Sequence, residues 1–71
     1  MEQPIAITGS VIRLGQLLKL AGIAGGGAEA KALIAAGYVT VNGEPELRRG
    51  RQLHPGDLVR CGADDLRIVA A

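Results

Sequence analysis

The spacing of apolar residues predicts two short helices in the first half of the chain, followed by strands. From Leu14 to Ala21 the apolar residues recur at positions i, i+3, i+4 and i+7, which is one face of a helix, and Gly22 supplies a helix stop. An alanine-rich stretch predicts a second helix from Ala28 to Ala36, which Gly37 ends in the same way. Both helices are too short to be stable alone, so each must pack against other elements.

Alternating polarity predicts several short strands in the second half of the chain. Residues 38–42 place Val39 and Val41 on one face, and Asn42-Gly43 is a strong hairpin signal. The other strands are expected at residues 44–47, 58–61 and 66–69, with turns at 54–57 and 62–65. Residues 4–12 predict one or two short strands at a sheet edge, because Pro4 lacks a backbone N–H group. Helices that precede most of the strands favour an α+β fold with a small antiparallel sheet.

Length and composition limit the class of protein. Seventy-one residues form one domain, residues 1–71, and its core must be aliphatic because hydrophobic residues make up 48% of the chain and Tyr38 is the only aromatic. The lone Cys61 has no disulfide partner, and with His54 it supplies too few ligands for zinc, so neither a metal nor a cofactor is expected. No stretch is long and apolar enough for a membrane span, and the first residues lack the signal-peptide pattern, which favours the cytoplasm.

Positive charge is concentrated after the predicted hairpin. The formal net charge is only +1, but three of the eight basic residues, Arg48, Arg49 and Arg51, fall within four positions. A guanidinium group has a planar set of donors that suits phosphate. Composition gives equal weight to two interpretations of this tract, a nucleic-acid contact and a solvated loop. The scarcity of aromatic side chains disfavours stacking on unpaired bases.

Two further positions carry candidate binding groups. Gly25–Gly27 opens the second helix, where free amide groups attract phosphate, and Lys31 follows one turn later. The favoured alternative for this segment is a flexible connector followed by a solubilising lysine. Asn42 could donate to a ligand, although the turn alone explains its presence.

No catalytic set is found in the sequence. His54 precedes a proline in a turn, without a second histidine or a nucleophile beside it, and Cys61 is expected to be a small buried residue. Asp64 and Asp65 are adjacent, so they do not converge naturally on one metal or one scissile bond. We therefore expect a protein that is not an enzyme.

Four segments together resemble a known family. They are Leu14–Leu18, Ala30–Ile34, Gly37–Gly43 (Gly-Tyr-Val-Thr-Val-Asn-Gly) and Gly56–Val59. This combination is similar to the S-four RNA-binding domain, named for a small-subunit ribosomal protein, and covers about residues 12–60. Leu17–Leu20, the glycine-rich opening and Glu46–Gly50 look most like the stand-alone bacterial branch, the YbcJ-like proteins.

The resemblance implies a fold, a ligand and a set of contacts. The implied fold is the αL motif, in which two helices pack on a small bent antiparallel sheet, and the implied ligand is structured RNA, ribosomal or transfer. Carried over onto this chain, the contacts come from the first helix, the second helix and the loop after the hairpin: Lys19, Lys31, Arg48, Arg49 and Arg51. Asn42, in the hairpin turn itself, is a further candidate contact with RNA. Gly26-Gly27-Ala28 departs from the family, because many members have a basic pair where the second helix begins.

Two other functions are alternatives to RNA binding. The segment from Val41 to Val59 also resembles the ubiquitin-like sulfur carriers, but these end in Gly-Gly, whereas Ala70-Ala71 ends this sequence. A protein-interaction or assembly module without a nucleic-acid ligand is the remaining alternative. Salt separates it from RNA binding, since phosphate contacts weaken steeply as the salt concentration rises.

Overall fold

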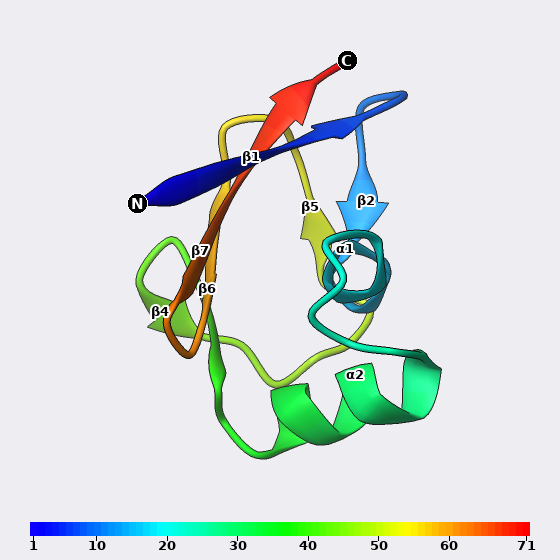
Figure 1. Ribbon diagram of the computed structural model, residues 1–71, viewed down its shortest axis with the longest axis vertical. Coiled ribbons are helices and arrows are strands. Elements are labelled where there is room, and N and C mark those ends of the chain that lie inside the picture. Colours follow the sequence, from blue (N-terminus) through cyan, green and yellow to red (C-terminus); the bar gives the residue numbers. More distant parts are fainter.

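The computed structural model describes residues 1–71 and contains two helices and seven strands (Figure 1). In chain order these are β1 (Glu2–Ile7), β2 (Ile12–Arg13), α1 (Leu14–Leu20), α2 (Gly27–Ala35), β3 (Val39–Val41), β4 (Glu44–Pro45), β5 (Gln52–Leu53), β6 (Leu58–Cys61) and β7 (Asp64–Ala70). Both predicted helices are confirmed to within one residue at each end. Neither helix has the length and apolar composition needed to cross a membrane.

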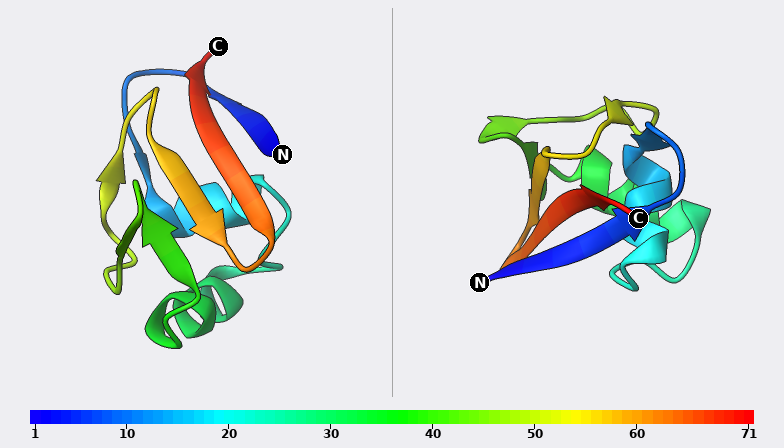
Figure 2. Two further views of the ribbon diagram at one scale, coloured as in Figure 1. Left: turned by 90° about the vertical axis from the view of Figure 1, so that its left-hand side faces the viewer. Right: turned by 90° about the horizontal axis from the view of Figure 1, so that it is seen from above.

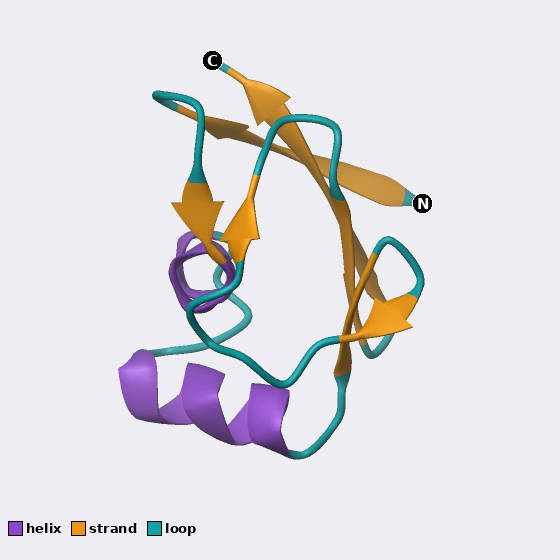
Figure 3. Cartoon of the chain, turned by 180° about the vertical axis from the view of Figure 1, so that it is seen from behind, coloured by secondary structure: helices purple, strands orange, loops and turns teal.

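The strands form a five-stranded sheet in the order β1-β7-β6-β3-β4, with β2 and β5 paired separately. Both helices lie on one side of the curved large sheet, and the β2–β5 pair lies beside α1 (Figure 3). The predicted α+β architecture of two helices packed on a small bent sheet is therefore confirmed. Pro4 in β1 and Pro45 in β4 interrupt the outer strands, which protects the exposed sheet edges from pairing with another chain.

The sheet is mixed rather than antiparallel throughout, which corrects the sequence-based expectation. β1 runs parallel to β7, with Glu2 opposite Asp65 and Ile7 opposite Ala70, whereas the other strand pairs are antiparallel. The two parallel strands lie side by side near the two termini (Figure 2). Parallel pairing needs a long connection between the strands, and here nearly the whole domain provides it.

The core is built from alternate strand residues and from the inner faces of the helices. Leu14, Leu17 and Leu18 of α1 are fully buried, as are Val39, Val59 and Leu66 of the sheet. All fifteen buried hydrophobic residues belong to one cluster. α1 and α2 are thus held by aliphatic packing, and their outer faces are free to carry polar side chains.

The hairpin between β3 and β4 has the predicted backbone conformation. Asn42 and Gly43 both have positive φ, at 52° and 87°, as a type I′ turn requires. The later hairpin is tighter than expected, because Cys61 pairs with Asp64 and only Gly62 and Ala63 remain in its loop. Asp65 belongs to β7, where its carboxylate accepts a hydrogen bond from Arg60 across the strand pair. β4 is also shorter than expected, because it ends at Pro45, two residues before the predicted end of this strand.

Candidate nucleic-acid interface

The eight basic residues divide equally into paired and unpaired groups. Those with a carboxylate within ion-pair distance are Arg48, Arg51, Arg60 and Arg67. Those without one are Arg13, Lys19, Lys31 and Arg49. The first three lie on the helices or directly before one, and Arg49 lies in the segment between β4 and β5, whose backbone is bonded to the start of α1. Uncompensated positive charge is therefore confined to the helical side of the molecule.

The outer face of the large sheet carries its own balancing charges. Arg60 donates to Asp65 at 2.7 Å, and Arg67 donates to Glu2 at 2.8 Å and to the carbonyl oxygen of Gly56 at 2.7 Å. The guanidinium of Arg60 lowers the pKa of Asp65, and that of Arg67 lowers the pKa of Glu2. Because these charges are already paired, the phosphates of a polyanion would gain little binding energy at this face.

Three of the unpaired cations meet in one depression, the basic hollow. Its volume is about 400 Å³, and it is lined by Arg13, Gly15, Gln16, Lys19, Gly27, Ala30, Arg49 and Gly50. The lining residues come from the end of β2, from α1, from the first turn of α2, and from the segment between β4 and β5, which passes close to α1 in Figure 3. No acidic side chain lines it. The hollow therefore combines an excess of positive charge with a concave shape.

The loop that supplies Arg49 is fixed to the start of α1 by backbone hydrogen bonds. The N–H groups of Leu14 and Gly15 donate to the carbonyl oxygens of Arg51 and Arg49, at 2.9 and 3.0 Å. Amides in the first turn of a helix have no partner within the helix, so the loop satisfies them. Arg49 then runs directly over Gly15, where a Cβ atom would lie 2.6 Å from its Cγ. Glycine at position 15 thus leaves the space in which the Arg49 side chain lies.

Replacing Gly15 by alanine is expected to separate folding from binding. Alanine favours the helix by up to about 1 kcal/mol, which offsets the cost of moving the Arg49 side chain, so the free energy of unfolding should change little. RNA affinity should fall several-fold, because Arg49 is displaced from the basic hollow. Urea denaturation and fluorescence anisotropy with a labelled RNA stem-loop measure the two effects. Unchanged affinity would show that the position of the Arg49 side chain does not matter for RNA binding. Gly26→Ala is the control, because a Cβ atom added at Gly26 would have no neighbouring atom within 4 Å.

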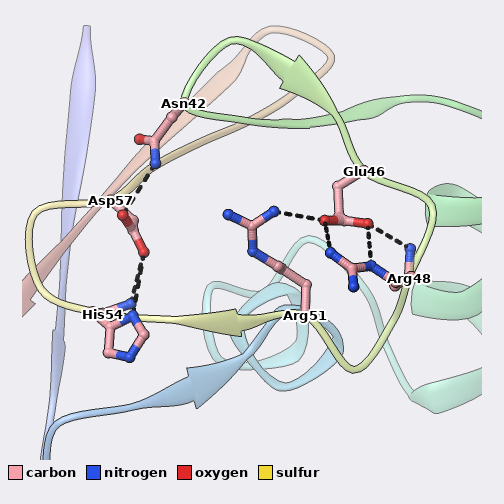
Figure 4. Close-up of polar contacts among 6 residues, drawn as sticks. All are labelled: Asn42, Glu46, Arg48, Arg51, His54 and Asp57. Atoms are coloured by element: carbon pink, nitrogen blue, oxygen red, sulfur yellow. Dashed lines mark hydrogen bonds and ion pairs between the residues drawn. The ribbon is translucent and has the colours of Figure 1, made fainter.

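Arg48 and Arg51 have a different environment from Arg49. Both donate to Glu46, whose side chain is only 8% exposed: Arg51 Nη1 at 2.8 Å, and Arg48 through Nε at 3.1 Å, Nη2 at 3.2 Å and its backbone N–H at 3.1 Å (Figure 4). The hydrogen bonds from Arg48, and then the one from Arg51, hold the pKa of Glu46 at about 2. Glu46 is therefore a carboxylate at neutral pH and compensates part of the charge of the tract.

The three arginines do not form one surface. Arg49 lines the basic hollow, whereas Arg48 and Arg51 line a second depression of about 710 Å³ with Gly50, Gln52, His54 and Asp57. In this second depression Asp57 and the adjacent Glu46 balance the two arginines. The arginine tract thus contributes to one positively charged hollow and to one nearly neutral depression.

Asn42 uses both ends of its side-chain amide within the protein. Its Nδ2 donates to Asp57 Oδ1 at 3.1 Å, and its Oδ1 accepts from the N–H of Leu58 at 2.9 Å. Burial raises the pKa of Asp57, but hydrogen bonds from the His54 N–H and from Asn42 outweigh this effect and leave the pKa lowered (Figure 4). Asn42 thus connects the β3–β4 hairpin to the turn before β6, and its predicted contact with RNA competes with these bonds.

A side chain of α2 accepts a hydrogen bond from the glycine-rich segment that precedes this helix. The carboxylate of Glu29 accepts a hydrogen bond from the Gly25 N–H at 3.0 Å. Gly27 lines the basic hollow, and Lys31 follows it by one helical turn on the exposed surface of α2. Lys31 therefore extends the positive charge of the hollow along α2, and its contact with RNA stays a prediction.

Arg13 was not among the residues singled out from the sequence. It lies directly before the apolar stripe of α1, where its backbone N–H donates to Gln16 Oε1 at 3.2 Å and its side chain lines the basic hollow. The available signal was a basic residue immediately before the first helical leucine, at the position where the chain enters α1.

No three side chains of the His, Cys, Asp or Glu type are grouped to bind a metal. Burial raises the pKa of the Cys61 thiol.

Comparison with known proteins identifies the family of this chain. The family model of the S4 domain matches residues 5–69, from β1 to β7. This chain belongs to the S4 domain family. The resemblance in residues 12–60 is thereby confirmed, and the match extends into β1 and β7, the adjacent parallel strands formed by the two ends of the chain.

A bacterial protein with a named role is also similar over nearly its whole length. It is the "Probable ribosome maturation protein RlbA" of Bacillus subtilis (strain 168), which is 48% identical over 70 residues. The alignment covers 97% of this S4 domain chain and 99% of the relative. A single S4 domain thus makes up almost all of the relative as well.

Proposed function

We propose that this S4 domain protein binds structured RNA without catalysing a reaction, and that the basic hollow is its main contact. The observation that carries the proposal is the meeting of Arg13, Lys19 and Arg49 in one depression without an acidic side chain. Like charges held together repel one another, and a phosphate group placed among them removes that repulsion. The two arginines offer planar donors, and the lysine offers a compact charge.

The proposed contacts differ in part from the set expected from the sequence. Arg13, Lys19, Lys31 and Arg49 would bind phosphate oxygens, while Arg48, Arg51 and Asn42 would hold the surrounding loops in place. Phosphate contacts fix position and orientation but carry no direct sequence information. Recognition would therefore depend on the shape of the RNA, as is usual for helical RNA.

The relative suggests the setting in which this binding takes place. The name of that relative refers to ribosome maturation. We infer that the RNA partner of this chain is ribosomal RNA, or a precursor of it, and that the protein acts in the cytoplasm. An assembly module that contacts proteins is the second candidate, favoured by the exposed Val11 and Leu20 beside an apolar depression.

The salt dependence of RNA binding tests the proposal. With four cations at phosphates, the logarithm of the binding constant should fall with the logarithm of salt concentration with a slope of about −3. Fluorescence anisotropy of a labelled RNA stem-loop over a range of salt concentrations measures this slope. A single-stranded RNA of the same composition should bind more weakly. Binding that is absent, or that is indifferent to salt, would favour the protein-contact alternative.

A further inference from the structure

A nearly buried carboxylate lies within the proposed RNA-binding region. Glu46 is 6% exposed and lies two residues before Arg48 and five before Arg51, the two arginines that it binds. A carboxylate repels phosphate, so simple electrostatics predicts that Glu46 weakens RNA binding. Its contacts suggest the opposite effect.

We propose that Glu46 is a positioning residue for RNA binding, which directs Arg49 into the basic hollow by holding the arginines on either side of it. This inference rests on the proposed function, because its effect is exerted through Arg49 on RNA. Glu46 itself does not touch the ligand in this arrangement.

The first step is the attachment of Glu46 to the sheet. Its backbone N–H donates to the carbonyl oxygen of Val39 in β3 at 3.1 Å. The carboxylate is therefore presented from a fixed point of the core. Its Oε1 accepts from both arginines, at 2.8 Å from Arg51 and 3.2 Å from Arg48, so one oxygen bridges the two side chains (Figure 4).

The second step is the closure of the loop around Arg49. The N–H of Arg51 donates to the carbonyl oxygen of Arg48 at 3.3 Å, which makes a turn with Arg49 and Gly50 at its tip. The carbonyl oxygens of Arg49 and Arg51 then accept from the first amides of α1. Glu46, the turn and α1 thus form one connected set of hydrogen bonds, and the direction of the Arg49 side chain depends on all of them.

Electrostatic repulsion and the positioning of Arg49 predict opposite changes in RNA affinity when the Glu46 carboxylate is removed. With the carboxylate present, Glu46, Arg48 and Arg51 together carry one positive charge. Without it, both arginines are released and the positive charge beside the basic hollow doubles. A purely electrostatic effect therefore predicts tighter RNA binding for Glu46→Gln, whereas a positioning role predicts weaker binding.

We expect Glu46→Gln to bind a fluorescein-labelled RNA stem-loop about tenfold more weakly, with the slope of the salt dependence reduced by about one, the loss of one phosphate contact. The matched control is Glu44→Gln, which removes the same charge from an exposed side chain without a hydrogen bond or ion pair. Glu44→Gln should bind RNA equally well or slightly more tightly. Equal or tighter binding by Glu46→Gln, with a steeper slope, would overturn the positioning role.

A second measurement separates this inference from the proposed function. Hydrogen exchange of the Leu14 and Gly15 amides, followed by NMR without RNA, should be at least about tenfold faster in Glu46→Gln, because their loop acceptors are released. If the wild-type protein binds no RNA, the proposed function fails, and this exchange result still decides whether Glu46 positions the loop. Unchanged exchange at both amides counts against the inference whatever the RNA result.

A variant with a milder change covers the case in which Glu46→Gln does not fold. Arg48→Gln removes a side chain that is 73% exposed but leaves the Arg51–Glu46 ion pair in place. Faster exchange at Leu14 and Gly15 together with weaker RNA binding supports the inference. Unchanged exchange with weaker binding would instead make Arg48 a direct phosphate contact and would overturn it.

Discussion

Replacing Arg13 and Arg49 together by glutamine is expected to weaken RNA binding roughly a hundredfold, about 3 kcal/mol, if each loses one charge-assisted hydrogen bond to phosphate. The slope of the salt dependence should become shallower by about two. Neither arginine has an ion-pair partner in the protein, so the free energy of unfolding should change little. Anisotropy titrations at several salt concentrations, with urea denaturation of the same samples, measure these quantities.

The chain offers a control of identical composition. Arg60→Gln with Arg67→Gln also removes two arginines and takes the formal net charge from +1 to −1, but it changes the outer face of the sheet. RNA affinity should fall only slightly, and stability should fall by no more than about 1 kcal/mol for each surface ion pair lost. Equal losses of affinity in the two double variants would mean that RNA responds to net charge alone and that the basic hollow is not its site.

Replacing Asn42 by alanine is expected to destabilise the domain by about 2–3 kcal/mol. Two internal hydrogen bonds are lost, and alanine must adopt the φ of 52° that asparagine tolerates. A domain of this length has a total stability of roughly 4–10 kcal/mol, so the loss is a large part of it. The salt slope of RNA binding should stay unchanged for the folded protein, because the side chain is used internally. Urea denaturation and anisotropy at low temperature measure the two.

Asn42→Gly is the informative companion variant. Glycine accepts a positive φ without strain but also lacks the amide, so its stability should lie between those of the wild type and Asn42→Ala. The opposite pattern for Asn42→Ala, with stability preserved and RNA affinity lowered, would make Asn42 a direct RNA contact, the role considered for it from the sequence.

Local signals account for the part of the fold that was predictable. The leucine spacing of α1, the alanine content of α2 and the Asn42-Gly43 turn each depend on neighbouring residues, and each element was found where expected. The parallel pairing of β1 with β7 depends on residues more than sixty positions apart, such as Glu2 and Asp65. Nothing in either segment alone indicates the direction of its partner.

The site shows the same division between local and distant causes. The basic tract and Lys31 could be singled out from the sequence because their charge is visible in the chain itself. The meeting of Arg49 with Arg13 and Lys19 could not, since it depends on the loop crossing α1 at Gly15. The ion pairs of Glu46 were missed for a related reason. A carboxylate shortly before two arginines compensates them only when the intervening chain turns back on itself.

The parallel pairing of β1 with β7 also affects the order in which the protein folds during its synthesis. β1 is made before the other elements of this domain, but its only partner in the sheet is β7, the last of them in chain order. The isoleucines of β1 therefore have no strand to pack beside until synthesis of β7 is complete. Contacts of such high sequence separation slow folding. The helices and the segment between β4 and β5 lie between these two strands in the chain, so the basic hollow becomes stable only once β7 has paired with β1.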